Sequence, residues 1–138
     1  MSESPGGCKC GQIQYRVSGP TLQVVACHCA MCRSMTGAPI SSYVVVREED
    51  FSVTSGNDGL ASYTVTERTK RHFCTNCGTP IFNSNPHTYK DLTMVYLGTV
   101  QGHETLVPRI GIYCESKLPW LSISESVRSF PDAPKGNS

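Results

Sequence analysis

The sequence predicts a mainly β fold, in which short strands form an antiparallel β-sandwich in a single domain. Short segments of alternating or β-branched residues are separated by clusters of glycine, proline, serine and asparagine, which are typical turn residues. No segment shows the sustained 3.6-residue hydrophobic period of an amphipathic helix. The 138 residues are long enough for one modest core.

The spacing of the turns predicts about eight to ten short strands. The first, at 12–17, alternates strictly and places Ile13, Tyr15 and Val17 on one face, as expected of a half-buried strand. The segment 33–39 is expected to be a turn or a single helical turn. The other expected strands lie at 22–26, 40–46, 51–54, 60–65, 71–73, 81–82, 92–100, 107–113 and 120–123.

The domain is expected to span residues 1–130, with 131–138 as a disordered tail because this end is rich in proline and small polar residues. The first seven residues have neither the basic start nor the apolar core of a signal peptide. The longest apolar run, 43–46, is the length of a strand and not of a bilayer span. We therefore expect a soluble, cytoplasmic protein without a membrane partner.

The charge and the cysteine content further limit the classes of function that the sequence can have. The formal net charge is +1, and acidic and basic residues are mixed along the chain without a basic stripe, which argues against a nucleic-acid partner. The chain contains eight cysteines, and its first residues lead us to expect no export signal. Because cytosolic thiols are kept reduced, such a cysteine content indicates metal binding rather than disulfides.

Seven of the eight cysteines form three groups whose spacing suits thiolates that share a metal ion: Cys8 and Cys10; Cys27, Cys29 and Cys32; Cys74 and Cys77. A structural zinc site is closed by four ligands, whereas a catalytic zinc has three protein ligands and one open position. The simplest partition places the two pairs on a structural zinc and the group of three on a second zinc. The first site would stabilise the fold by closing a long loop.

Other partitions remain open at this point. Cys74 and Cys77 could share a zinc with two members of the group of three, or His28 could join that group as a fourth ligand. Adjacent histidine and cysteine side chains rarely converge on one ion, so His28 is instead expected to be a solvated loop residue or a nearby proton carrier. Cys114 is expected to be a small buried hydrophobic residue, with a ligand role as the alternative.

Four motifs occur in the order and spacing of a known family: Gly-Cys-Lys-Cys-Gly at 7–11, Cys-His-Cys-Ala-Met-Cys-Arg at 27–33 followed by Gly37, Arg-His-Phe-Cys-Thr-Asn-Cys-Gly-Thr-Pro at 71–80, and Pro119-Trp120. Over residues 6–123 the chain resembles the glutathione-dependent formaldehyde-activating enzyme family, which shares its domain with centromere protein V. The resemblance implies a zinc-stapled β fold, the zinc partition above, and a carbon–sulfur lyase that makes or releases S-hydroxymethylglutathione. Many members carry a histidine where this chain has Gly111.

In this interpretation Cys27, Cys29 and Cys32 are catalytic residues. A zinc ion on three thiolates can take a substrate thiol as its fourth ligand and lower the pKa of that thiol, so that the sulfur attacks a carbonyl carbon such as that of formaldehyde. Glutathione carries two carboxylates, so its site should present cations. Arg33 and Arg71 are the candidates for binding glutathione, together with Lys70; surface solvation or strand-edge protection is the alternative role.

Two other classes of function fit the cysteines. The first is a non-catalytic, zinc-stabilised binding module, which needs only the closed site. The second is a redox or metal-handling protein that uses the group of three as labile thiols. The number of zinc ions separates the enzyme from the module, since the enzyme requires two per chain and the module one. Reversible release of zinc by a mild oxidant, without loss of the fold, would favour the redox or metal-handling protein.

Overall fold

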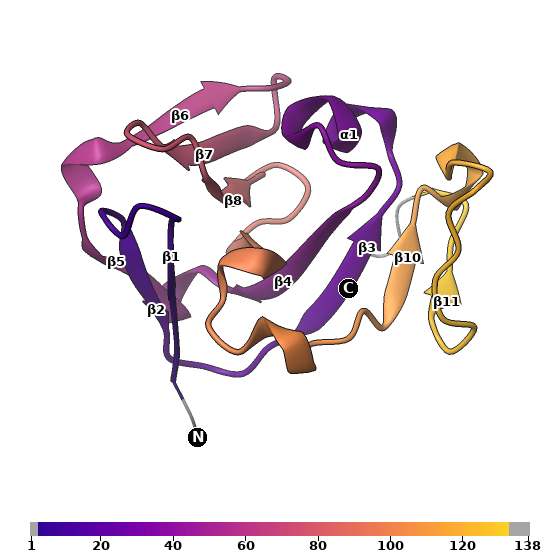
Figure 1. Ribbon diagram of the computed structural model, residues 1–138, viewed down its shortest axis with the longest axis horizontal. Coiled ribbons are helices and arrows are strands. Elements are labelled where there is room, and N and C mark those ends of the chain that lie inside the picture. The colour runs from indigo at the N-terminus through magenta and orange to yellow at the C-terminus, as the bar shows by residue number, and fades with distance from the viewer. Residues whose placement is uncertain (1–2, 133–138) are drawn as a thin grey trace.

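The computed structural model describes residues 3–132 and confirms a mainly β fold of two sheets (Figure 1). The smaller sheet has the order β1-β2-β5, and the larger has the order β11-β10-β3-β4-β9-β8-β7-β6. The strands are β1 (Ser4–Gly7), β2 (Gln14–Val17), β3 (Gln23–Cys27), β4 (Ser41–Arg47), β5 (Phe51–Ser55), β6 (Leu60–Thr64), β7 (Lys70–Cys74), β8 (Pro80–Ser84), β9 (Leu92–Tyr96), β10 (Ile110–Ile112) and β11 (Arg128–Ser129).

Most neighbouring strands are antiparallel, as predicted, but β10 pairs in parallel with both β3 and β11. The connection after β9 brings the chain back to the starting end of β3, where Arg109 N donates a hydrogen bond to Val24 O. Strand β10 therefore enters the sheet in the same direction as β3. The larger sheet is consequently mixed at this edge.

Several predicted strands differ from the structure in extent. The predicted long strand 92–100 ends at Tyr96 and continues as a 3₁₀ turn over Leu97–Thr99, and the predicted strand 120–123 is not a strand. Strands β1 and β11 were not predicted. Strand β1 has the sequence Ser-Pro-Gly-Gly, which carries no hydrophobic alternation, and β11 is only two residues long.

The helix α1 (Ala30–Thr36) begins inside the group of three cysteines, earlier than the predicted turn. Cys29 caps its start, since the Cys29 sulfur accepts a hydrogen bond from Cys32 N at 3.2 Å. Gly37 ends it in the left-handed conformation, with φ of 76°, which glycine adopts without a steric penalty. Seven residues are too few for a helical period to show in the sequence.

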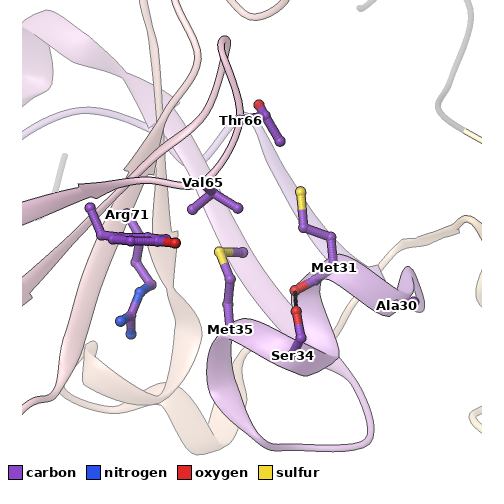
Figure 2. Close-up of a pocket in the computed structure, with 8 residues that line it drawn as sticks. Ala30, Met31, Ser34, Met35, Val65, Thr66 and Arg71 are labelled. Carbon is purple, nitrogen blue, oxygen red and sulfur yellow. Dashed lines mark hydrogen bonds between the residues drawn. The ribbon is translucent and has the colours of Figure 1, made fainter.

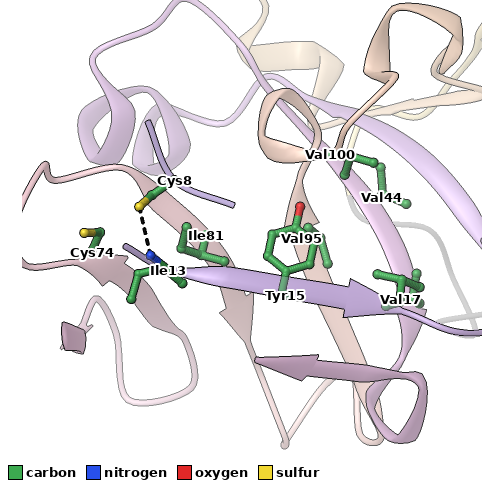
Figure 3. Close-up of a cluster of buried hydrophobic side chains, with 10 residues drawn as sticks. Cys8, Ile13, Tyr15, Val17, Val44, Cys74, Ile81, Val95 and Val100 are labelled. Carbon is green, nitrogen blue, oxygen red and sulfur yellow. Dashed lines mark hydrogen bonds between the residues drawn. The ribbon is translucent and has the colours of Figure 1, made fainter. Parts of the chain in front are cut away.

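The buried side chains form two clusters on opposite faces of the larger sheet. The larger cluster lies between the sheets and contains Ile13, Tyr15 and Val17, packed with Val44 and Val95 (Figure 3). This arrangement confirms the alternation predicted for the strand at 12–17, which is β2, and its packing in a sandwich. The smaller cluster, on the far face, consists of Cys27, Cys32, Tyr43 and Tyr96.

The structure describes only the first two residues of the predicted carboxyl-terminal tail, 131–138. Within the predicted tail, Asp132 O accepts a backbone hydrogen bond from Tyr113 N at 3.3 Å. The rest of that tail, 133–138, lies outside the described residues. Among residues 3–132, no helix has the length and apolar character needed to cross a membrane.

Candidate metal centres and the adjacent cleft

The structure brings Cys8, Cys10, Cys74 and Cys77 together, with all four sulfur atoms within 4.8 Å of one another. The Cys10 sulfur lies 3.5 Å from that of Cys8 and 3.8 Å from that of Cys74. Four sulfurs at a zinc–sulfur distance of about 2.3 Å are separated by about 3.8 Å in a tetrahedron. The four side chains are therefore close enough to one another to hold one zinc ion.

Two tight turns present these sulfurs and direct backbone N–H groups at them. Ile13 N donates to Cys8 Sγ at 3.2 Å, and Asn76 N donates to Cys74 Sγ at 3.3 Å. A hydroxyl contributes at the exposed ligand: the Thr79 side chain, 3.1 Å from the sulfur, is the main cause that lowers the pKa of Cys77 to about 5. Donors aimed at sulfur favour the thiolates that a metal requires.

The second group, Cys27, Cys29 and Cys32, also gathers its three sulfurs within 4.8 Å of one another. Cys27 ends β3, Cys29 caps α1, and Cys32 lies in the first turn of the helix, so one strand-to-helix turn supplies all three. Among the described residues, no fourth cysteine, histidine or carboxylate joins the group. Cys27 and Cys32 are buried, whereas Cys29 is partly exposed.

The three sulfurs share their protons unequally. Hydrogen bonds from Cys27 and then Cys32 lower the pKa of Cys29 to about 2. Hydrogen bonding with Cys29 and Cys32, together with burial, raises the pKa of Cys27 above its usual range. The first negative charge therefore resides on Cys29. Deprotonating a second or third cysteine is unfavourable because neighbouring thiolates repel one another. A bound cation would remove this cost, so the donor set suits a metal ion.

A cleft of about 640 Å³ lies between α1 and the hairpin of β6 and β7 (Figure 2). Ala30 and Met31, which follow Cys29 directly, form one end of its lining; the other lining residues are Ser34, Met35, Tyr63, Val65, Thr66 and Arg71. Apart from Arg71, these residues are uncharged. The cleft is thus mainly apolar. None of the three cysteines lines it, but the helix that Cys29 caps forms one of its walls.

The two arginines that are predicted to bind glutathione have different surroundings. The guanidinium carbon of Arg71 lies over the Phe73 ring, 5.0 Å from its centroid, and the buried Arg71 Nε has no hydrogen-bond partner among residues 3–132. Arg33 instead donates from Nη1 to two backbone oxygens, His28 O at 2.6 Å and Ser116 O at 2.9 Å. Arg33 therefore clamps the cysteine-bearing turn to the loop after β10, and Arg71 provides the cation in the cleft.

His28 is fully buried, so the expectation of a solvated loop histidine is wrong. Within the part of the chain that the structure describes, neither ring nitrogen has a hydrogen-bond partner, and the ring does not join the three sulfurs. Burial, followed by the nearby charges of Lys117 and Arg33, lowers the pKa of His28. Its imidazole is therefore neutral near pH 7.

Gly111 lies on the sheet face opposite the group of three. A Cβ atom at this position would meet Cys114 Sγ at 3.4 Å, whereas the neighbouring residue Ile112 packs beside Cys27. Because successive residues of a strand point to opposite faces, a side chain at 111 would point away from the three sulfurs. Glycine in place of histidine at position 111 therefore removes no side chain from around the three sulfurs. Cys114 is partly exposed, so the expectation of a buried residue is wrong, and its sulfur belongs to neither group.

The family model described as glutathione-dependent formaldehyde-activating enzyme matches residues 3–116, which include both groups of cysteines. The chain belongs to this family. The match confirms the predicted resemblance and covers three of the four motifs, since Pro119-Trp120 lies beyond it, and it identifies the protein as a member of an enzyme family.

Similar proteins agree with this family assignment. An uncharacterized lyase of Schizosaccharomyces pombe is 27% identical over 82 residues, which cover 59% of this chain and 58% of the relative. A relative in Aspergillus terreus, whose name contains the family's description, is 32% identical over 94 residues, or 65% of this chain and 49% of the relative. The chain thus spans about half the length of such relatives. A solved structure from Rhodobacter sphaeroides shares the fold, with a TM-score of 0.58 at 23% identity over 71% of this chain and 88% of the other.

Proposed function

We propose that this protein is a zinc-dependent carbon–sulfur lyase that acts on an adduct of a thiol and an aldehyde, such as S-hydroxymethylglutathione. The observation that supports this proposal is the group of three sulfurs, which has no fourth ligand among residues 3–132 and lies at the start of the helix that lines a cleft with one cation. Membership of the family supports glutathione and formaldehyde as the first substrates to test.

The proposed roles follow from the positions of the side chains. Cys27, Cys29 and Cys32 would hold the catalytic zinc, which supplies positive charge that favours the thiolate form of a substrate thiol. Cys29 is the partly exposed member, so the thiol would approach from its side. Met31 and Met35 would contact the apolar parts of the substrate, and Arg71 would pair with a carboxylate.

The four-cysteine group would hold a structural zinc, so that two zinc ions bind per chain. Counting zinc in the wild type and in two cysteine variants tests this arrangement. We expect two zinc ions per chain in the wild type and in Cys114→Ala, the matched control outside both groups, but only one in Cys29→Ala. A single zinc in both the wild type and Cys29→Ala would rule out the two-site arrangement and leave the zinc-stabilised binding module.

Exchange NMR tests the substrate. Glutathione and formaldehyde form their adduct reversibly, and the enzyme should increase the exchange rate between free and adduct forms. Cys29→Ala should not increase it, whereas Cys114→Ala should act as the wild type does. An exchange rate that the two-zinc wild type leaves unchanged would exclude formaldehyde and direct the search to other aldehydes or thiols. The cytoplasmic location and the absence of nucleic-acid and membrane partners stay predictions.

A further inference from the structure

A buried chain of three polar side chains ends on Cys32. The Tyr43 hydroxyl lies 3.2 Å from Cys32 Sγ, Asn83 Nδ2 donates to the Tyr43 oxygen at 3.3 Å, and the Tyr96 hydroxyl donates to Asn83 Oδ1 at 3.0 Å. All three side chains are buried. The strand order β4-β9-β8 places them on the face that carries the group of three, because Tyr43 pairs with Tyr96 across these strands.

The amide of Asn83 fixes the direction of this chain. Tyr96 donates its single hydroxyl proton to the amide oxygen, so the amide nitrogen is turned toward Tyr43 and donates to it. Tyr43 accepts that hydrogen bond and keeps its own proton for the remaining neighbour, Cys32 Sγ. A cysteine that holds a metal has no proton on its sulfur and can only accept. The direction of the chain is therefore the one that a metal-holding Cys32 requires.

The surroundings of Cys32 make this donor important. Two groups lie within hydrogen-bond distance of Cys32 Sγ among the described residues, Cys27 Sγ at 3.4 Å and the Tyr43 hydroxyl. Once the cysteines hold a metal, only the hydroxyl still has a proton to donate. Cys29 differs, because its sulfur already accepts a backbone N–H. Cys32 thus depends on a side chain for the hydrogen bond that Cys29 receives from the helix.

We propose that Tyr43 is a positioning residue of the three-cysteine site, whose hydroxyl donates to Cys32 Sγ and orients it for metal, with Asn83 and Tyr96 holding the hydroxyl in place. The inference rests on the proposed function, since it assigns Tyr43 a role toward the metal of that site. Groups that hydrogen-bond to metal ligands and orient them typically change metal affinity by about 10- to 100-fold when removed.

Tyr43→Phe tests the inference, with Tyr15→Phe as the matched control. Tyr15 is also a buried tyrosine, and its hydroxyl lies 2.7 Å from Thr99 Oγ1, but it belongs to the cluster on the other sheet face. Competition with a chelator measures the affinity for each zinc. We expect Tyr43→Phe to weaken the less tightly held zinc by about 10-fold or more, with the tighter zinc unchanged and Tyr15→Phe equal to the wild type. Tyr96→Phe should weaken the same zinc to a smaller extent.

The absorption spectrum of bound cobalt(II) gives a signal that a loss of fold stability alone would not change. After one equivalent of zinc has filled the tighter site, cobalt(II) in the other site gives sulfur-to-metal charge-transfer bands. Loss of a hydrogen bond to the sulfur should shift these bands to longer wavelength in Tyr43→Phe and not in Tyr15→Phe. Two zinc ions held by folded Tyr43→Phe and Tyr96→Phe as tightly as by the wild type would overturn the inference alone. One zinc per wild-type chain would overturn the proposed function with it.

Discussion

At the residue scale, Arg33 and Arg71 look alike in the sequence, since each lies beside a cysteine motif, but the fold separates their roles. Arg33 donates to backbone oxygens of His28 and Ser116, and Ser116 is far away in the sequence. The guanidinium of Arg71 rests against Phe73 and lines the cleft. The motifs identify both residues as candidates, and the tertiary contacts favour Arg71 as the one to test for ligand binding.

Replacing Arg71 with methionine should weaken binding of a carboxylate-bearing thiol while leaving the zinc content unchanged. The substitution keeps an apolar stem in the cleft and removes only the charge, and a hydrogen bond to a charged group contributes about 1.5–3 kcal/mol. We therefore expect KM for glutathione to rise by about 10- to 100-fold. Arg68→Met is the control, because Arg68 is exposed on the same hairpin and does not line the cleft. Equal KM values for Arg71→Met and the wild type would remove Arg71 from the site.

His72 should make the protein less stable in mild acid. Burial, and secondarily Lys70, lowers the pKa of His72, whose ring stacks on Phe82 at 4.1 Å. Because its pKa is lowered in the folded state, His72 binds a proton more readily when the protein is unfolded. Its contribution to the free energy of unfolding is therefore complete above the unfolded-state pKa of about 6.5 and is lost as the pH falls through the folded-state pKa. Urea denaturation at pH 7.5 and at pH 5.5 should show a smaller decrease in unfolding free energy for His72→Phe than for the wild type. Identical decreases would contradict the assignment.

At the element scale, strands with strict alternation could be predicted, and the helix could not. Ile13, Tyr15 and Val17 identify β2 because a half-buried strand has a period of two. The cysteine groups were also predictable, since their members lie close together in the sequence and zinc coordination limits the combinations. The link from Tyr43 to Asn83 could not be predicted, because it depends on the order in which distant strands pair.

The end of α1 gives a stability prediction. Gly37 has φ of +76°, and a Cβ atom there would have no neighbour within 4 Å, so the cost of Gly37→Ala comes from the backbone alone. The left-handed conformation costs a non-glycine residue about 1–2 kcal/mol, and urea denaturation should show a loss of about that size. Gly98→Ala is the matched control, since its Cβ also has no neighbour within 4 Å and its φ is not positive. Equal stability of the two variants would mean that α1 ends differently in solution.

At the scale of the whole molecule, the two cysteine groups serve different parts of the fold. Cys8 precedes β2 of the smaller sheet, and Cys74 ends β7 of the larger sheet, so the four-cysteine group joins the two sheets at the edge of their shared core. The group of three lies on the far face, and a single turn supplies it. Loss of metal from the first group should therefore loosen the sandwich, whereas loss from the second should leave it intact.

Cys10→Ala and Cys29→Ala test this division of roles. Cys10 is exposed, so truncating its side chain removes little packing, in contrast to the core members Cys8 and Cys74. A ligand that binds only the folded state at a thousandfold excess over its Kd stabilises that state by about 4 kcal/mol. We therefore expect Cys10→Ala to lose about that much unfolding free energy in zinc-containing buffer, and Cys29→Ala to lose much less. Chelator should lower the wild type to the level of Cys10→Ala and have little further effect on that variant. If both variants lost the same amount, the two groups would contribute equally to holding the sheets together, and the distinction between a structural and a catalytic zinc would fail.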